Sequence, residues 1–552
     1  MANTAIDGRG ALDVSHKRVI LASSLGTVFE WYDFYLYGSL AVIIGHQFFS
    51  GLNEASQLVF ALLAFAAGFA VRPFGALVFG RVGDLVGRKY TFLITIVIMG
   101  LSTFLVGLLP SYGSIGIAAP VILILLRMLQ GLALGGEYGG AATYVAEHAP
   151  AGKRGLYTSF IQITATFGLF LSLLVILGCK WMLGDKFDDW GWRVPFLISS
   201  LLLAVSVYIR MQLHESPVFQ QMKEEGKQSK APLTDSFGRW SNLKLVILAL
   251  LGATAGQAVV WYCGQFYSMY FLGTTLRIDA TTTQLLIAAA LAIGTPFFVV
   301  FGWLSDKIGR KPVVLAGCLL AAVTYFPIFK GITHYGNPAI EAASVAAPVT
   351  VIADPATCHL QINLTGTSTF TSSCDIAKST LAKRGVPYDN QAAPAGTLAK
   401  VTVGGGASVD AFEGEGLAKA DFAAQNTAFA ASLGAALDQA GYPAKADPAQ
   451  ANYPMLVFLL FLLVLYVTMV YGPIAAWLVE MFPTKIRYTS MSLPYHIGNG
   501  WFGGFLPSVS FGIVALTGNI YSGLWYPVVI ALATFVIGMF FVRETKDVDL
   551  SA

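Results

Sequence analysis

Two acidic side chains interrupt an otherwise apolar and aromatic run near the start of the chain. Glu30, Asp33 and Tyr37 lie in FEWYDFYLYG at residues 29–38, and their spacing places them on one face of a helix. A carboxylate inside a membrane costs at least a few kcal/mol, so it normally meets a cation, water or a proton. Burial raises the pKa of a carboxyl group and a nearby cation lowers it. An acid that alternates between these surroundings can take up and release a proton.

We therefore expect at least one of Glu30 and Asp33 to titrate, and we favour Asp33 because it lies deeper in the run. The alternative is a static ion pair, or a hydrogen bond to a neighbouring helix.

A second polar stripe supplies a possible counter-charge. Arg127, Gln130 and Glu137 share one face of a helix, and an arginine stays charged at this depth. Arg127 can hold the carboxylate of a bound molecule through a forked pair of hydrogen bonds, or it can neutralise Glu30, Asp33 or Glu137. A permanent pair between the two helices is the alternative. We expect Glu137 to take part in proton coupling, and Gln130 and Tyr37 to contact the bound molecule.

Further polar groups lie within apolar runs and can line a midplane cavity or form interhelical hydrogen bonds. Gln257, Trp261 and Gln265 share a face, and His496 can carry a proton or serve a structural role. The remaining members of this group are Gln162, Tyr262, Tyr495, Asn499 and Trp501. From it we select Gln162, Gln257, Gln265 and Asn499 as candidate binding residues.

The composition decides what elements carry these residues. Hydrophobic residues make up 55% of the chain, charged residues 12%, and the mean hydropathy is +0.65. A spanning helix needs roughly 20 apolar residues, and the sequence predicts an all-α polytopic membrane protein with twelve such spans. They are 19–44, 57–79, 90–109, 119–142, 156–178, 193–211, 243–271, 283–303, 312–330, 454–478, 488–516 and 521–542. We expect no cleaved signal peptide, because no small-residue cleavage site follows the first apolar run.

Basic residues are distributed unequally between the two sides. With both termini cytoplasmic, most of the loop Lys and Arg residues lie inside, and the opposite short loops hold only Lys180, Lys186, Arg193 and Arg277. The predicted division is a cytoplasmic tail at 1–18, a six-helix bundle at 19–211, a central cytoplasmic loop at 212–242, helices seven to nine at 243–330, an extracytoplasmic insert at 331–453, helices ten to twelve at 454–542, and a cytoplasmic tail at 543–552.

The two halves are internal duplicates. GRVGDLVGRK at 80–89 and GWLSDKIGRK at 302–311 agree at five of ten positions. VAEHAPAGKRG at 145–155 and LVEMFPTKIRY at 478–488 align Glu147 with Glu480 and Arg154 with Arg487, and we expect these four residues to form matching ion pairs at the cytoplasmic side.

The insert at 331–453 separates these markers in the second half. It holds Cys358 and Cys374, which either form a disulfide in an oxidising compartment or stay free. Its fold is left open: 417–441 could be helical and KVTVGGGASV could be a hairpin or a loop. NLT at 363–365 matches a glycosylation sequon, a triplet that also arises by chance.

These features together resemble the major facilitator superfamily. Within it, EWYDFYLYG, RMLQGLALGGEYGGAATYVAEHAP, GWRVPF and HESPVF are similar to the metabolite:proton symporter family, whose members take up organic acids or zwitterions such as proline and betaine. The resemblance implies two six-helix halves and a gate that holds the outward-open state. It assigns that gate to Asp84, Arg88, Asp306 and Arg310, and a static role in folding and topology is the alternative. The insert departs from the usual family pattern.

We therefore expect a secondary active transporter in the cell membrane that takes up a small carboxylate-bearing metabolite, an organic acid, together with H⁺ by alternating access.

 The alternatives are uptake of a zwitterionic compatible solute of the proline or betaine type, and a polytopic ligand sensor. No nucleotide-binding loop, zinc motif or nucleophile elbow occurs, so we expect neither an enzyme nor a cofactor. No basic patch suggests nucleic acid. We expect a monomer in the lipid bilayer, in a bacterial inner membrane.

Overall fold

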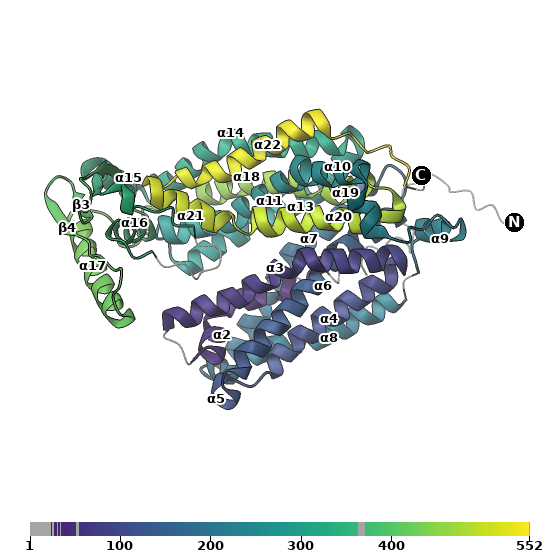
Figure 1. Ribbon diagram of the computed structural model, residues 1–552, viewed down its shortest axis with the longest axis horizontal. Coiled ribbons are helices and arrows are strands. Elements are labelled where there is room, and N and C mark those ends of the chain that lie inside the picture. Colours follow the sequence, from purple (N-terminus) through teal and green to yellow (C-terminus); the bar gives the residue numbers. More distant parts are fainter. Residues whose placement is uncertain are drawn as a thin grey trace.

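The computed structural model describes residues 24, 27–29, 31–33, 35–50, 54–212, 214–362 and 370–550. Two helical bundles lie side by side, converge at the end where the C-terminus lies, and diverge toward the other end (Figure 1). Within the described residues, ten helical stretches are long and apolar enough to cross a membrane, and they coincide with predicted spans three to twelve. The membrane part is all-α, as predicted.

The first bundle contains the helices of spans one to six. Described residues between 27 and 39 are helical and lead into α2, and the second predicted span lies within α3. The helices are α2 (Ala41–Phe48), α3 (Glu54–Leu85), α4 (Arg88–Leu108), the short α5 (Tyr112–Ile115), α6 (Ala118–His148), α7 (Arg154–Leu183) and α8 (Arg193–Met211). The connection to the second bundle carries α9 (Pro217–Glu224), where Ser216 accepts a hydrogen bond from the Phe219 amide and Pro217 occupies the first turn.

Glycines set how closely α3 and α6 pack. A methyl group on Gly131 would lie 1.9 Å from the Gly68 carbonyl oxygen, and one on Gly75 would lie 1.9 Å from that of Leu132. Neither position could hold a side chain without moving a backbone. The glycine-rich run in α6 therefore serves close helix packing.

The second bundle differs from the first because two of its spanning helices contain π-helical turns. The seventh span consists of α10 (Trp240–Ala249), α11 (Ala255–Tyr262) and α12 (Ser268–Tyr270), joined by π-helical turns, and the eleventh consists of α20 (Arg487–Ile497) and α21 (Leu506–Thr517), joined by a π-helical turn at Gly498–Gly503. The other helices are α13 (Ala280–Ile308), α14 (Arg310–Gly336), α18 (Tyr453–Tyr471), α19 (Ile474–Met481) and α22 (Trp525–Phe541).

The insert is a small α/β unit and not a loop. Its helices are α15 (Pro338–Ala346), α16 (Ser373–Lys383) and α17 (Lys419–Gln439), and its strands are β1 (Val349–Ala353), β2 (Asp389–Ala392), β3 (Lys400–Val403) and β4 (Ala407–Asp410). The sheet has the order β2-β1-β3-β4, with β1 parallel to β2 and antiparallel to β3.

The structure decides most of the features of the insert that the sequence left open. The 417–441 stretch is helical in α17, and KVTVGGGASV forms the β3–β4 hairpin, in which Val401 pairs with Val409. Cys358 and Cys374 form a disulfide between the segment after β1 and the first turn of α16. The sequon at 363–365 lies outside the described residues.

The insert rests on the diverging end of the second bundle (Figure 1). The Tyr388 amide donates to the Gly518 carbonyl at 3.0 Å, and Lys378 Nζ donates to the Leu516 carbonyl at 3.2 Å. The Asn452 amide donates to the Tyr335 carbonyl at 2.8 Å, so the chain leaves and re-enters the bundle at neighbouring points. Helix α14 continues to Gly336, beyond the predicted span end at 330, because its last turns pack against this junction.

Candidate functional site

The predicted pair between the first and fourth spans is present. Arg127 Nη1 donates to Asp33 Oδ2 at 3.0 Å, and the exposed fractions of the two residues are 4% and 1%. The ring of Tyr37 lies 4.2 Å from the Arg127 guanidinium carbon, and the Tyr37 hydroxyl donates to the Ala61 carbonyl. A buried ion pair needs such additional contacts to offset the loss of hydration. Glu30 lies outside the described residues.

Gln130 completes this cluster. Its Nε2 donates to Asp33 Oδ1 at 3.3 Å and to Thr103 Oγ1 at 2.8 Å, while its Oε1 accepts from Arg127 Nη1 at 2.5 Å. The structure therefore joins four of the predicted site residues in one network: Asp33, Tyr37, Arg127 and Gln130.

Glu137 has a partner that the sequence did not suggest. Arg210 Nη2 donates to Glu137 Oε1 at 2.5 Å, and Thr95 Oγ1 donates to Glu137 Oε2 at 2.8 Å. The Arg210 guanidinium also covers the Phe92 ring at 3.4 Å. The sequence signal for this pair was Arg210 itself, an arginine near the end of an apolar span. An arginine at that position is normally an anchor at the membrane interface, so the sequence alone did not indicate the pair. Glu137 thus lies in a separate network from Asp33.

The predicted amide residues fall into different settings. Gln257 and Asn499 form two reciprocal hydrogen bonds, each of 3.2 Å, across spans seven and eleven. Gln162 Nε2 donates to the Tyr138 hydroxyl at 2.8 Å, and its Oε1 is buried with no hydrogen-bond partner among the described residues. Gln265 is 7% exposed and lies in the π-helical turn after α11.

Aromatic rings join the two bundles close to these polar residues, since Gln162 bonds to one of them, Tyr138. Tyr138 of the first bundle stacks on Tyr495 of the second with ring centroids 3.6 Å apart, and the Tyr495 and Tyr471 hydroxyls lie 2.8 Å apart. Trp31 and Trp261, also from opposite bundles, have centroids 5.3 Å apart. We call these five residues the ring cluster. Tyr471 was not selected from the sequence.

Arg72 in α3 was also missed. It is half-buried, its guanidinium lies 4.3 Å from the Phe69 ring, and its Nε is buried without a hydrogen-bond partner among the residues that the structure describes. It forms no ion pair with any described residue, and the carbonyl oxygen of Phe69, one turn earlier in α3, lies 3.9 Å from the point where a methyl group on Gly500 of the eleventh span would stand. An arginine inside the apolar run AVRPFG was a signal, since a charge at this depth is costly without a function.

The converging end holds the four predicted gate residues. Asp84 accepts from Arg88 Nη1 at 3.0 Å and, across the bundle boundary, from the Thr489 amide at 2.9 Å. Asp306 accepts from Arg310 Nη1 at 2.7 Å and from the Gly155 amide at 2.8 Å. Each aspartate therefore occupies the N-terminus of a helix in the opposite half, where free amides favour an anion.

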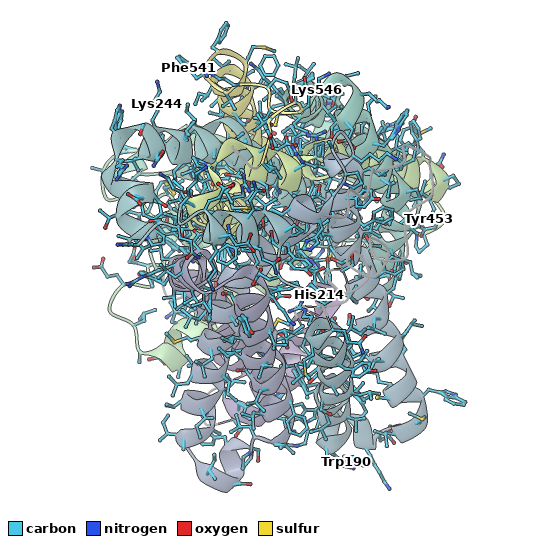
Figure 2. The ribbon with its side chains drawn as sticks, turned by 90° about the vertical axis from the view of Figure 1, so that its right-hand side faces the viewer. Trp190, His214, Lys244, Tyr453, Phe541 and Lys546 are labelled. Atoms are coloured by element: carbon cyan, nitrogen blue, oxygen red, sulfur yellow. A yellow bond between two sulfur atoms is a disulfide. The ribbon has the colours of Figure 1, made fainter. Side chains whose placement is uncertain are left out.

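Glutamates and arginines from the second repeated motif also cross the boundary. Arg487 Nη1 donates to Glu147 Oε1 at 2.8 Å, and Arg154 Nη1 lies 3.5 Å from Glu480 Oε1. The expected matching pairs are thus formed between halves. Figure 2 views this end and shows His214 near the line where the bundles meet. The carbonyl of His214 accepts from the Tyr144 hydroxyl at 2.6 Å.

The segment after α22 adds to this contact. The Val548 carbonyl accepts from Arg154 Nη1 at 2.6 Å, and the Leu550 carbonyl accepts from Thr484 Oγ1 at 2.5 Å. Together these bonds tie the converging ends of both bundles.

Comparison with known proteins supplies the family. A family described as "Sugar (and other) transporter" matches residues 19–243 and 424–552, and one described as "MFS/sugar transport protein" matches 150–353. The chain belongs to the sugar transporter family of the major facilitator superfamily. The transporter is thus a multi-pass membrane protein, not an enzyme, as expected.

Curated relatives of the transporter carry several names. It is 38% identical over 332 residues to the inner membrane metabolite transport protein YhjE of Escherichia coli K12, covering 59% of this chain and 74% of that protein. It is 38% identical over 325 residues to the proline/betaine transporter of the same strain, covering 57% and 64%. It is 34% identical over 345 residues to the alpha-ketoglutarate permease of that strain, covering 61% and 78%.

Solved structures agree on the fold of the transporter. The proton:xylose symporter XylE bound to 6-bromo-6-deoxy-D-glucose matches with a TM-score of 0.62 at 16% identity, covering 97% of this chain and 98% of that one. XylE from E. coli in a partially occluded inward-open conformation matches with a TM-score of 0.56. The predicted architecture of twelve spanning helices in two halves, inferred from the apolar runs and the internal repeats, is confirmed.

Proposed function

We propose that the transporter takes up a small carboxylate-bearing metabolite together with a proton. The observation that carries this proposal is Arg72, a cation within a span that has no carboxylate partner among the described residues. It lies in α3, which borders the eleventh span of the opposite half near Gly500. An anion bound there would contact both halves, which is what alternating access requires of a substrate.

Asp33 is the proposed proton carrier. Its only charged partner among the described residues is Arg127, and the pair is almost fully buried. A proton on Asp33 would weaken that pair and free the first helix to shift. Trp31 lies two positions away and contacts Trp261 of the other half, so such a shift would reach the ring cluster.

Glu137 fits a structural role better than a coupling role. Arg210 and Thr95 already satisfy its carboxylate, and both lie within the first bundle. We therefore propose that the Glu137–Arg210 pair holds α6 to α8 within the first bundle.

The contacts at the converging end indicate which side of the transporter is closed. We propose that this end faces the cytoplasm, because it holds most of the loop Lys and Arg residues. With Asp84, Asp306, Glu147 and Glu480 engaged across the boundary, the conformation described is closed to the cytoplasm. Release of substrate would require these contacts and the ring cluster to separate.

Uptake into proteoliposomes tests the proposal. A panel of radiolabelled mono-, di- and tricarboxylates, shikimate and glycine betaine is supplied with and without an inward pH gradient. We expect concentrative uptake of a carboxylate only with the gradient. Uptake that ignores both the gradient and a protonophore would exclude symport.

A second candidate function is uptake of a zwitterionic compatible solute. It is favoured by one curated relative that is named a proline/betaine transporter. Arg72 would suit the carboxylate of such a solute equally well, so the same panel separates the two candidates.

A further inference from the structure

We infer that the junction between the insert and the seventh span is a binding site for a small oxyanion, either free inorganic phosphate or the phosphate of a lipid headgroup. Arg277, which follows the seventh span, and Arg384, at the end of α16, hold the oxyanion between them. The bound group thereby joins the insert to the second bundle. This inference does not rest on the proposed function.

A hollow of about 110 Å³ lies between the insert and the end of the seventh span. Its wall includes Arg277 from the bundle, and Arg384, Asp438 and Tyr442 from the insert. One water molecule occupies roughly 30 Å³ in the liquid, so the hollow has room for an oxyanion but not for a large metabolite. Figure 1 shows α16 and α17, the insert helices that border the hollow, beside the diverging end of the second bundle.

Backbone carbonyls hold both arginines in place. Arg277 Nε donates to the Ala444 carbonyl at 3.1 Å, and its Nη1 donates to the Lys383 carbonyl at 3.4 Å. Arg384 Nη2 donates to the Ala430 carbonyl at 3.1 Å. A guanidinium has five N–H donors, so each arginine keeps donors for a further partner. Arginines oriented in this way suit the forked hydrogen bonds that carboxylates and phosphates accept.

The two cations lack a counter-charge from the protein. Neither Arg277 nor Arg384 forms an ion pair with a described residue, and Asp438 lines the same hollow without pairing with either. Both arginines are half-buried. Like charges in a partly desolvated hollow repel each other, and an anion between them replaces that repulsion with attraction. The hollow therefore favours an anion over a neutral or cationic occupant.

Packing around Arg384 brings it to the side of the insert that meets the bundle. A methyl group on Gly434 of α17 would lie 2.3 Å from Arg384 Nη2, so only the absence of a side chain there gives the guanidinium room. A methyl group on Gly385 would lie 1.9 Å from the Thr275 carbonyl oxygen at the end of the seventh span. The two close approaches place Arg384 next to the segment that carries Arg277.

The backbone at Arg277 is strained. Its φ is +59°, and within the described part of the chain no other residue except glycine has a positive φ. A side chain adopts this conformation rarely and at a cost, so surrounding contacts must hold it. The Arg277 carbonyl accepts from the Ala446 amide at 3.1 Å, which ties this turn to the segment after α17. Glycine would adopt the turn without strain, but it would leave the hollow with one cation in place of two.

Hydrogen exchange in the full chain tests binding of free phosphate. The protein is placed in nanodiscs of phosphatidylcholine, and exchange in α16 and α17 is followed as inorganic phosphate is added. Sodium chloride at matched ionic strength controls for screening. A ligand that binds the folded state stabilises it, so we expect phosphate to slow exchange in both helices and chloride to leave it unchanged.

Nanodiscs that contain phosphatidylglycerol test the lipid headgroup as the source, with no phosphate in the buffer. Slower exchange in these nanodiscs than in phosphatidylcholine assigns the site to a headgroup, whereas an effect of added phosphate assigns it to a free oxyanion. Either effect supports the inference if it depends on both arginines. Equal exchange under all of these conditions would overturn it.

Variants of the two arginines test that dependence. Arg384→Gln should weaken binding about tenfold. Arg277→Asn should weaken it similarly, and asparagine tolerates the left-handed backbone of this position better than most residues. Lys400→Gln removes an exposed positive charge elsewhere on the insert and is the matched control, with no change expected. Unaltered protection in Arg277→Asn and Arg384→Gln would overturn the inference.

Asp438→Asn distinguishes lost binding from lost folding. The Asp438 side chain forms no hydrogen bond or ion pair with a described residue, and the substitution removes the negative charge from the wall of the hollow. We expect binding to become about two- to fivefold tighter, a gain that a misfolded insert could not produce. Unchanged or weaker binding in Asp438→Asn would overturn the assignment of an anion to this hollow.

Discussion

Glu147 and Arg487 lie 340 positions apart in the sequence and form an ion pair of 2.8 Å that joins the two halves. Arg88 Nε lies 3.7 Å from the other carboxylate oxygen of Glu147, and Ser216 Oγ donates to that oxygen as well. One buried carboxylate thus serves two arginines at the converging end.

Glu147→Gln should open that end. The substitution leaves Arg88 and Arg487 with less negative charge in a buried setting, and removing one partner of a buried pair costs roughly 3–5 kcal/mol. Spin labels at Lys153 and Lys307, which lie at exposed positions on opposite halves, should report a longer distance in a larger fraction of molecules. Glu225→Gln, in an exposed pair with Lys227, is the control and should leave the distance unchanged. An unaltered distance in Glu147→Gln would show that this pair does not hold the closed state.

Asp33→Asn should abolish the response to the pH gradient, because the amide cannot bind a proton. Substrate exchange at equal pH should persist. The loss of charge also leaves Arg127 without its carboxylate partner, at a cost of roughly 3–5 kcal/mol, so the double variant Asp33→Asn/Arg127→Gln should regain stability without regaining coupling. Asp279→Asn, at the exposed start of α13, is the control. Gradient-driven accumulation by Asp33→Asn would remove Asp33 as the proton carrier.

Glu137→Gln should lower stability but not coupling. Arg210 would stay buried without a carboxylate, again at roughly 3–5 kcal/mol, and Glu137→Gln/Arg210→Met should recover most of that loss. Thermal unfolding in detergent measures stability, and uptake across a range of pH gradients measures coupling. If the double variant folds normally and no longer responds to the gradient, Glu137 takes part in coupling as the sequence predicted.

Removal of the insert should preserve transport. Asn452 bonds to Tyr335 at 2.8 Å, so a short glycine-serine link can replace residues 338–451 without moving α14 or α18. Units whose ends lie close together tolerate such removal. We expect uptake within about twofold of the full chain, measured in the same liposomes. A loss of uptake in a correctly folded variant would assign the insert a role in the cycle.

Loss of the disulfide should affect only the insert. Cys358 and Cys374 are 16 positions apart, and closing a loop of that size contributes roughly 3 kcal/mol. Replacing both by Ser should increase hydrogen exchange in α16 and the β1 strand while the bundles stay protected. The double variant should no longer respond to a reducing agent, whereas the natural chain should. Equal exchange in the two proteins would show that the insert is stable without the bond.

The sequence by itself determined the architecture of the membrane part. Apolar length fixes where a helix can cross a bilayer, and the repeated GRK loops relate the two halves. The helical period also placed Asp33 and Tyr37 on one face of the first span, and Arg127 and Gln130 on one face of the fourth span. A network between these two faces could therefore be anticipated from the sequence.

Only the tertiary structure decided which charges meet. The period fixes the face of a side chain but not the neighbouring helix, so Glu137 pairs with Arg210 and not with Arg127. Arg72 likewise became a candidate only when packing left it without an ion pair to any described residue. The fold of the insert was open for the same reason: strands β1 and β3 pair although Val349 and Val403 lie 54 positions apart, and such long-range pairing leaves no local signal in the chain.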